Sequence, residues 1–89
     1  MGAVLMIERL VRAPAKVAGS KQVLRAVREG RLAAAYVARD ADPFVSRQVA
    51  DACEKAHVPV VEVDDMDALG RACGLDVRAA AAGILRGGN

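Results

Sequence analysis

The sequence has few of the residues that bind metals. Its 89 residues include one histidine, His57, and two cysteines, Cys53 and Cys73, which form no CxxC motif. These residues cannot supply the usual zinc-ligand spacings, and nothing in their placement indicates a disulfide or export. We therefore expect two buried, reduced thiols and neither a metal nor another cofactor. His57 precedes Val58-Pro59 at the predicted end of a helix, which favours a capping or surface role.

The motifs of nucleotide-using enzymes are also missing. Gly19-Ser20-Lys21 is similar to a phosphate loop but lacks the spacing G-x-x-x-x-G-K-[ST], and there is no G-x-G-x-x-G. Neither Ser20 nor Ser46 has a recognisable histidine partner. Aspartates at 40–42 and 64–67 could be imagined around magnesium, but helix caps explain them better. The chain is therefore predicted to have no catalytic residues, and a small nucleotide- or metal-using enzyme is the weakest of three hypotheses.

Long hydrophobic runs are absent. The apolar N-terminal stretch 1–7 is short, is followed at once by Glu8, and lacks the positive region and cleavage site of a signal peptide. No run is long enough to cross a bilayer. We therefore expect a cytoplasmic protein without a membrane partner.

Charge is distributed unevenly along a chain whose length predicts a single domain over residues 1–89. Residues 1–39 carry eight bases and two acids, whereas residues 40–89 carry five bases and nine acids. A basic half favours a polyanionic partner. The only aromatic residues are Tyr36 and Phe44, and Phe44 is expected to pack at a helix start. Because proteins that grip single-stranded RNA stack bases on several aromatic rings, an RNA partner should be structured.

Helical and extended patterns alternate along the chain, which predicts an α/β layered domain. Pro14 ends the first helix, Gly30 and Gly74 end two later ones, and Asp42-Pro43 is a favourable helix start. Residues 79–85 suit either a helix or a buried strand, and residues 87–89 are expected to form a frayed tail. The predicted helices are 7–13, 20–29, a helix from Pro43 to before Pro59, and 66–73; the predicted strands are 16–18, 33–38 and 60–63.

The helix after Gly19 carries the strongest functional signal. Lys21, Arg25 and Arg28 recur at i, i+4 and i+7 and so share one face, with Val23, Leu24 and Val27 opposite. A basic stripe beside a helix N-terminus suits phosphates and nucleic-acid edges. The alternative is the solvated face of an ordinary amphipathic helix.

Several short motifs occur together in a specific order. The motifs are Gly19-Ser20-Lys21-Gln22-x-x-Arg25, Ala38-x-Asp40-Ala41-Asp42-Pro43, Val58-Pro59-Val60, Leu69-Gly70-x-Ala72-Cys73-Gly74-Leu75-Asp76-Val77 and Ala79-Ala80-Ala81-Ala82. With these motifs the chain resembles the L7Ae family of ribosomal and kink-turn RNA-binding proteins, especially its small bacterial members, from Arg12 to Leu85.

The resemblance implies a fold and a function. The fold is a three-layer α-β-α sandwich with a mixed four-stranded sheet. The function is binding to kink-turns, which are sharply bent RNA helices with tandem sheared G·A pairs. The implied partner is structured RNA, either ribosomal RNA, a riboswitch or another kink-turn RNA, with the ribosome as a further candidate. We expect a non-enzymatic monomer without DNA specificity.

The resemblance also implies roles for individual residues. Gly19 would allow the backbone to approach the RNA, with Ser20 beside it, and Lys21 and Gln22 would contact guanine edges. Arg25 would contact a guanine or nearby phosphates, and Arg28 extends the basic stripe. Asp42 resembles an acidic position near the pocket for a flipped-out nucleotide, although it also suits a helix cap. The second RNA-contacting loop would consist of Leu75, Asp76, Val77 and Arg78, with a core role as the alternative for Leu75.

The chain departs from the archaeal and eukaryotic pattern Lys-Gly-x-Asn-Glu-x-x-Lys. The first lysine of the pattern is replaced by Ala18 and the last by Arg25. Lys21 stands in place of the asparagine and Gln22 in place of the glutamate. Met66 stands where many relatives have lysine. Glutamine keeps an amide oxygen but loses the carboxylate acceptor for guanine N–H groups. The alternative function is a ribosome-associated protein–protein interaction module with secondary RNA contact, carried by the acidic, alanine-rich second half.

Overall fold

A computed structural model of the chain describes the backbone of residues 2–87 and the side chains of residues 7–87. Residues 88 and 89 of the predicted frayed tail lie outside the described residues. The described elements, in chain order, are α1 (Gly2–Arg12), β1 (Lys16–Ala18), α2 (Ser20–Arg28), β2 (Leu32–Ala38), α3 (Pro43–Lys55), β3 (Val60–Val63), α4 (Met66–Ala72) and β4 (Ala81–Leu85).

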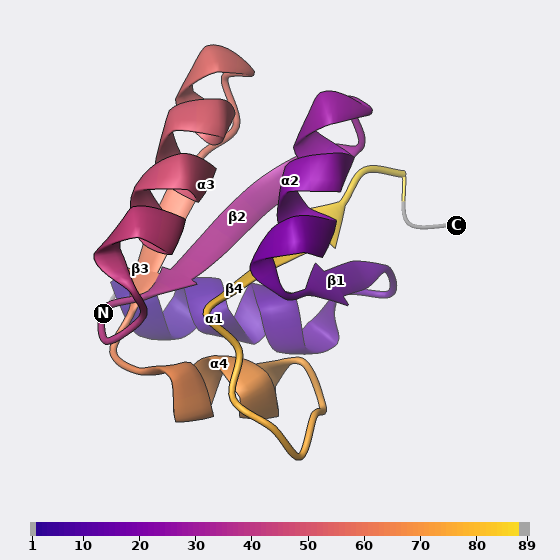
Figure 1. The fold of residues 1–89 in the computed structure, drawn as a ribbon. Helices are drawn as coiled ribbons and strands as arrows, with labels where there is room; N and C mark the ends of the chain where they lie inside the picture. The colour runs from indigo at the N-terminus through magenta and orange to yellow at the C-terminus, as the bar shows by residue number, and fades with distance from the viewer. Residues whose placement is uncertain (1, 88–89) are drawn as a thin grey trace.

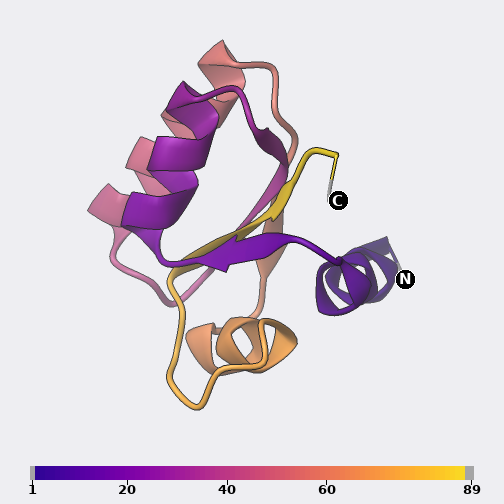
Figure 2. The same ribbon diagram turned by 90° about the vertical axis from the view of Figure 1, so that its right-hand side faces the viewer.

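The four strands form one mixed sheet in the order β1-β4-β2-β3 (Figure 1). β2 runs parallel to β3, whereas β4 is antiparallel to both β1 and β2. Helices α2 and α3 cover one face of the sheet, and α1 and α4 lie on the other (Figure 2). The predicted three-layer α-β-α sandwich with a mixed four-stranded sheet is therefore confirmed.

The central strand β2 is apolar throughout because both of its faces are covered. Ala34, Tyr36 and Ala38 belong to the core beneath α1 and α4, while Ala35 and Val37 belong to the core beneath α2 and α3. This alternation is the period-two pattern of a strand, and the alanines allow helices to approach closely. The alanine-rich run thus forms the middle layer of the sandwich.

Residues 81–85 form a strand, which settles the segment that the sequence left open. Ala33 is the extra residue of a β-bulge, since Leu32 and Ala34 pair with the consecutive residues Leu85 and Ile84. The bulge turns Leu32 into the core on the α2 side. A Cβ at Gly83 would overlap the Leu32 side chain, so glycine makes room for it. Tertiary packing therefore outweighs the helical propensity of the alanines.

Four local expectations need correction. The first helix begins at Gly2 and not near Ile7. The helix predicted from Pro43 to before Pro59 ends at Lys55, and Ala56, just beyond its end, is exposed. The Phe44 side chain does not pack at the helix start; it is 69% exposed. Cys73 is half-buried, whereas Cys53 is buried as expected, and burial raises the pKa of both thiols.

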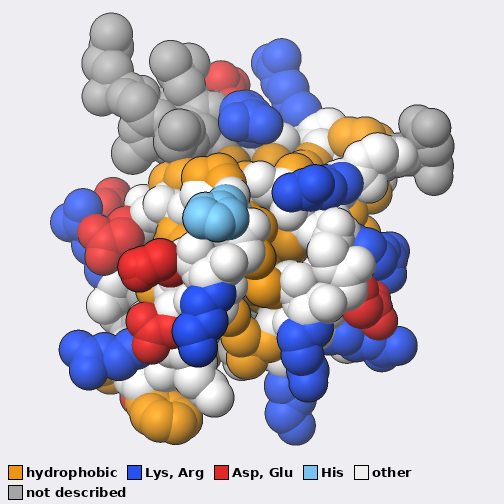
Figure 3. All heavy atoms as spheres, turned by 90° about the horizontal axis from the view of Figure 1, so that it is seen from above, with side chains coloured by type: hydrophobic (Ala, Val, Ile, Leu, Met, Phe, Trp, Pro, Cys, Tyr) orange, Lys and Arg blue, Asp and Glu red, His pale blue; other side chains and the backbone are white. Residues whose placement is uncertain are grey.

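The sheet has two distinct ends. The carboxyl ends of β1, β2 and β3 and the amino end of β4 lie at one end, here called the loop edge, with the connecting residues 19–22, 39–44 and 74–80. The opposite end, here called the far edge, holds the C-terminal ends of α2 and α3. Figure 3 views the molecule from the far edge, where blue Lys and Arg side chains crowd the α2 half of the surface.

Candidate functional site

Three predicted segments meet at the loop edge. The backbone N–H of Gly19 donates to the carbonyl of Ala81 over 2.8 Å, and that of Ala38 donates to the carbonyl of Ala80 over 3.0 Å. The start of α2, the turn after β2 and the loop before β4 are thereby tied to one edge of the sheet. Tertiary structure thus places the start of α2 at the edge of the sheet where the loop that contains residues 75–78 ends. The two RNA-contacting regions that the resemblance implied, residues 19–22 and 75–78, are far apart in sequence.

The N-terminus of α2 is open, unlike those of the next two helices. Asp42 accepts the Phe44 N–H over 2.9 Å at α3, and Asp65 accepts the Ala68 N–H over 2.7 Å at α4. At α2 the N-cap residue is Gly19, and no side chain among the described residues caps it. The first amides of a helix lack partners within the helix and carry its positive dipole end. An acceptor-rich ligand can therefore bind here without displacing a protein cap.

Gly19 is required for backbone geometry. Its φ of 96° is one that residues with a side chain rarely adopt. A Cβ built there would have no atom within 4 Å, so the position opens to free space on its outer side. The backbone can therefore come close to a ligand at this point.

The face of α2 matches the predicted amphipathic pattern. Val23 and Val27 are buried against the sheet, and Leu24 is half-buried. The predicted contact residues Lys21, Gln22, Arg25 and Arg28 are all exposed, and Ser20 is half-buried at the first helical position. The basic side chains are thus available to a partner.

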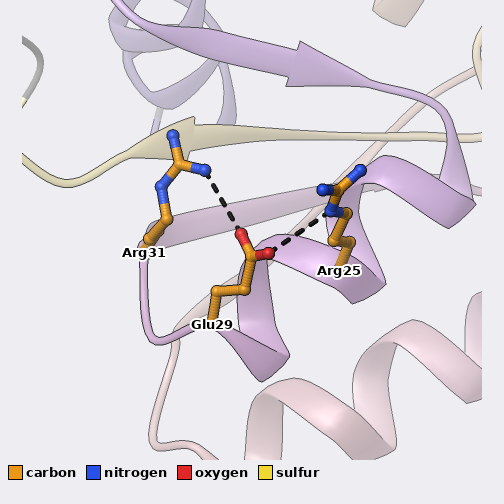
Figure 4. A network of polar contacts seen from close by, with 3 residues as sticks. All are labelled: Arg25, Glu29 and Arg31. Carbon is orange, nitrogen blue, oxygen red and sulfur yellow. Dashed lines mark hydrogen bonds and ion pairs between the residues drawn. The ribbon is translucent and has the colours of Figure 1, made fainter.

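Arg25 is already engaged by a carboxylate, which sequence reasoning missed. Its Nε lies 3.3 Å from one oxygen of Glu29, and a terminal nitrogen of Arg31 lies 3.2 Å from the other (Figure 4). The hydrogen bond from Arg25, followed by that from Arg31, lowers the pKa of the Glu29 carboxyl. The i, i+4 spacing of Arg25 and Glu29 on one helix could have predicted their ion pair from the sequence.

The aspartates near the loop edge act as helix caps. Asp42 is exposed and caps α3, in agreement with the helix-cap role that the sequence offered as an alternative. Asp40 accepts the Met66 N–H at the start of α4 over 2.8 Å. The magnesium alternative gains no support, because the described residues hold no group of three or more metal-binding side chains.

The loop after α4 presents side chains to solvent. Leu75 is 39% and Val77 is 68% exposed, and Asp76 and Arg78 are exposed as well. The core alternative for Leu75 is therefore wrong. With Phe44, these apolar residues leave three exposed large hydrophobic side chains at or beside the loop edge. Of these three residues, only Phe44 was not predicted to belong to the site.

Comparison with known proteins identifies the family. The family model of the ribosomal protein L7Ae/L30e/S12e/Gadd45 family matches residues 6–89. An RNA-binding protein of Geobacillus sp. (strain WCH70) is 44% identical over 79 residues, covering 89% of this chain and 96% of the relative. An RNA-binding protein of Geobacillus kaustophilus is 46% identical with the same coverage. The solved structure of the Giardia lamblia 15.5kD RNA binding protein matches 97% of this chain and 76% of its own, with a TM-score of 0.87 at 28% identity.

The fold and the open, basic helix start define a small α-β-α protein of the L7Ae type. The chain belongs to the ribosomal protein L7Ae/L30e/S12e/Gadd45 family. The prediction of a non-enzymatic protein is confirmed by the family match and by the relatives' names. Within residues 2–87, no helix is long and apolar enough to cross a membrane.

Proposed function

We propose that this protein binds RNA and recognises kink-turns, holding them in their bent form. The observation that carries the proposal is the uncapped N-terminus of α2, flanked by the exposed side chains of Lys21 and Gln22. The family match and the relatives named RNA-binding proteins support the same conclusion.

Each part of the loop edge has a distinct task in this proposal. The first amides of α2 and the side chains of Lys21 and Gln22 read base edges at the G·A pairs. Arg25 and Arg28 neutralise phosphates, and the absence of a side chain at Gly19 lets the RNA backbone come close. Leu75 and Val77 cover the bulged bases with apolar surface, between the charged side chains of Asp76 and Arg78. Asp42 lies beside the flipped-out nucleotide while it caps α3.

Binding acts by selection of an RNA conformation. A protein that contacts the bent form better than the extended one shifts the RNA population by no more than that difference in affinity. The proposed targets are kink-turns in ribosomal RNA, riboswitches or other structured RNA, bound by a monomer in the cytoplasm. No DNA specificity is proposed.

The test is a titration of a kink-turn RNA labelled at both ends, beside a variant with Watson–Crick pairs in place of the G·A pairs. We expect the wild-type protein to bind only the intact motif and to increase energy transfer between the labels. Lys21→Ala and Arg25→Ala should each weaken binding by roughly 1–3 kcal/mol if they make base or charge-assisted contacts.

Arg12→Ala is the matched control, because it removes one exposed positive charge from α1, on the other face of the sheet. It should leave the affinity for the kink-turn nearly unchanged. Equal binding of both RNAs would reduce the basic surface to a non-specific electrostatic patch. Binding to neither would refute the proposal and favour a protein partner.

A further inference from the structure

A hollow beside α2 extends the proposed RNA surface toward the far edge. Gln22, Arg25, Glu29 and Arg31 line it, with Val17 and Leu85 from the strands beneath. Gln22 and Arg25 belong to the proposed kink-turn site, whereas Arg31 lies beyond the end of α2. The hollow is therefore continuous with the site and adds a cation to it.

The Glu29 carboxylate shows what kind of group fits between the two arginines. One of its oxygens lies 3.3 Å from Arg25 and the other 3.2 Å from Arg31, so a two-oxygen anion bridges the guanidinium groups (Figure 4). A phosphodiester offers two such oxygens and pairs with guanidinium groups in the same way. Each arginine uses a single nitrogen in these contacts and retains further donors.

The carboxylate can be replaced at low cost. The side chains of Arg25, Glu29 and Arg31 are 68%, 41% and 61% exposed, and exposed ion pairs contribute little to stability. Displaced from the arginines, the Glu29 carboxylate returns to water and is not left buried. An arriving phosphate therefore competes with a weak internal partner.

The surroundings favour an anion. The backbone N–H of Arg86 donates to the Arg31 carbonyl over 2.6 Å, and its Nε donates to the Leu32 carbonyl over 3.3 Å. Arg86 is thereby held next to Arg31, and the exposed Arg28 lies on the last turn of α2. Four arginines thus accompany Glu29 at this end of α2.

The hollow lies within reach of a strand bound at the loop edge. Nine residues of α2 span roughly 13 Å at 1.5 Å per residue, a length that a nucleic-acid strand covers in a few nucleotides. From this geometry we propose that the hollow binds a backbone phosphate of the RNA between Arg25 and Arg31. Glu29 occupies this phosphate site in the free protein and is displaced on binding. This inference rests on the proposed RNA binding.

The test compares Arg31→Gln, Glu29→Gln and the control Arg12→Gln by titration of the two RNAs over a range of salt. Arg31→Gln should weaken binding about five- to tenfold near 0.1 M salt and lower the slope of log affinity against log salt by about one. Glu29→Gln should strengthen binding severalfold, since it removes the internal competitor. Arg12→Gln should match the wild type, and thermal unfolding should show all three variants folded.

The two proposals fail in different ways. A phosphate contact carries no sequence information, so Arg31→Gln should weaken binding to any RNA that the protein binds, whether or not the G·A pairs are intact. If Lys21→Ala weakens kink-turn binding while Arg31→Gln equals Arg12→Gln, the phosphate site is refuted and the kink-turn proposal stands. If neither RNA binds the wild type, both proposals are refuted.

A competition arm separates RNA from free phosphate as the ligand. Inorganic phosphate at about 10 mM should lower RNA affinity no more than chloride at the same ionic strength. Specific competition in the wild type that disappears in Arg31→Gln would identify the hollow as a free-anion site and overturn its assignment to RNA.

Discussion

Three helices end with the same hydrogen bonds but with different residues at the critical position. At the C-termini of α2, α3 and α4, the backbone N–H groups of the two residues after the C-cap donate to carbonyls of the last turn. The critical position is the first of these two residues, which is Gly30, His57 or Gly74. This arrangement needs a left-handed residue, which is normally glycine. His57 adopts the conformation with φ of 59° and is exposed. The sequence predicted a capping or a surface role for His57, and the residue has both: its backbone N–H closes the end of α3 and the residue is exposed.

His57→Gly should therefore stabilise the protein. A residue with a side chain in the left-handed region lowers the free energy of unfolding by roughly 1–2 kcal/mol relative to glycine. The greater conformational freedom of glycine in the unfolded chain offsets part of this difference. We expect a net gain of about 0.5–1 kcal/mol in the free energy of unfolding, measured by urea denaturation.

Gly74→Ala is the mirror control. Gly74 has φ of 75° and open space around it, so the added methyl group meets no atom but strains the backbone. It should cost about 1 kcal/mol. Equal stability of wild type and His57→Gly would show that the His57 side chain compensates for its conformation.

At the level of the elements, one glycine fixes the second loop on α4. A Cβ at Gly70 would overlap the carbonyl oxygen of Val77 and lie 3.1 Å from its carbonyl carbon. The Gly70 carbonyl also accepts the Leu75 N–H over 3.0 Å. Because the obstacle is backbone, a side chain at this position must push the loop away from the helix.

Gly70→Ala should thus damage both stability and RNA binding. Overpacking of this kind costs typically about 1–3 kcal/mol, and the displaced loop should weaken kink-turn affinity severalfold. Ala68→Gly, in the same helix, should cost about 1 kcal/mol through helix propensity and leave affinity unchanged. Unchanged affinity in Gly70→Ala would remove the 75–78 loop from the proposed RNA surface.

Lys16 shows how elements far apart in sequence are joined. Its ammonium donates to the carbonyls of Leu10 and Val11 over 3.3 and 2.9 Å, and to that of Ala72 over 3.5 Å. A cation at a helix C-terminus is favourable, and here one cation serves both α1 and α4. The sequence contained no signal for the link to Ala72, which lies 56 residues away.

At the scale of the whole molecule, stability should decline in alkaline solution. Burial raises the pKa of Cys53 and Cys73 above 9.0 and that of Tyr36 above 10.0. Cys53 belongs to the α2 and α3 side and Tyr36 to the opposite side, so both cores contribute. Below these ordinary values stability is fully present; above them the unfolded chain releases its protons first, and stability falls as pH rises through the folded values.

The loss should approach about 1.4 kcal/mol per pH unit for each group over the interval in which only its unfolded form is ionised. Urea unfolding between about pH 8 and pH 11 measures it. A Cys53→Ala, Cys73→Ala double variant should start less stable but lose stability less steeply. Equal slopes in the two proteins would exclude the thiols as the cause.

Much of the fold could be read from local patterns. Caps and stops such as Asp42, Gly30 and Gly74 act within a few residues, so their positions define α2, α3 and α4 in the sequence itself. Residues 81–85 could not be assigned, because alanine suits a helix and a buried strand equally until neighbouring strands are present. Phe44 was misplaced for a related reason: whether a helix start is covered depends on the elements around it.

The sequence by itself determined the order of the elements, the two faces of α2 and, through the resemblance, the family, because these depend on short-range spacing and residue type. Only the tertiary structure decided that α2, unlike α3 and α4, lacks a side-chain cap at its N-terminus, and that Arg25 and Arg31 share the Glu29 carboxylate. It alone joined Gly19, before α2, to Ala81, the first residue of β4, through a hydrogen bond that spans most of the chain. Such contacts depend on how the strands order in the sheet, which no local pattern specifies.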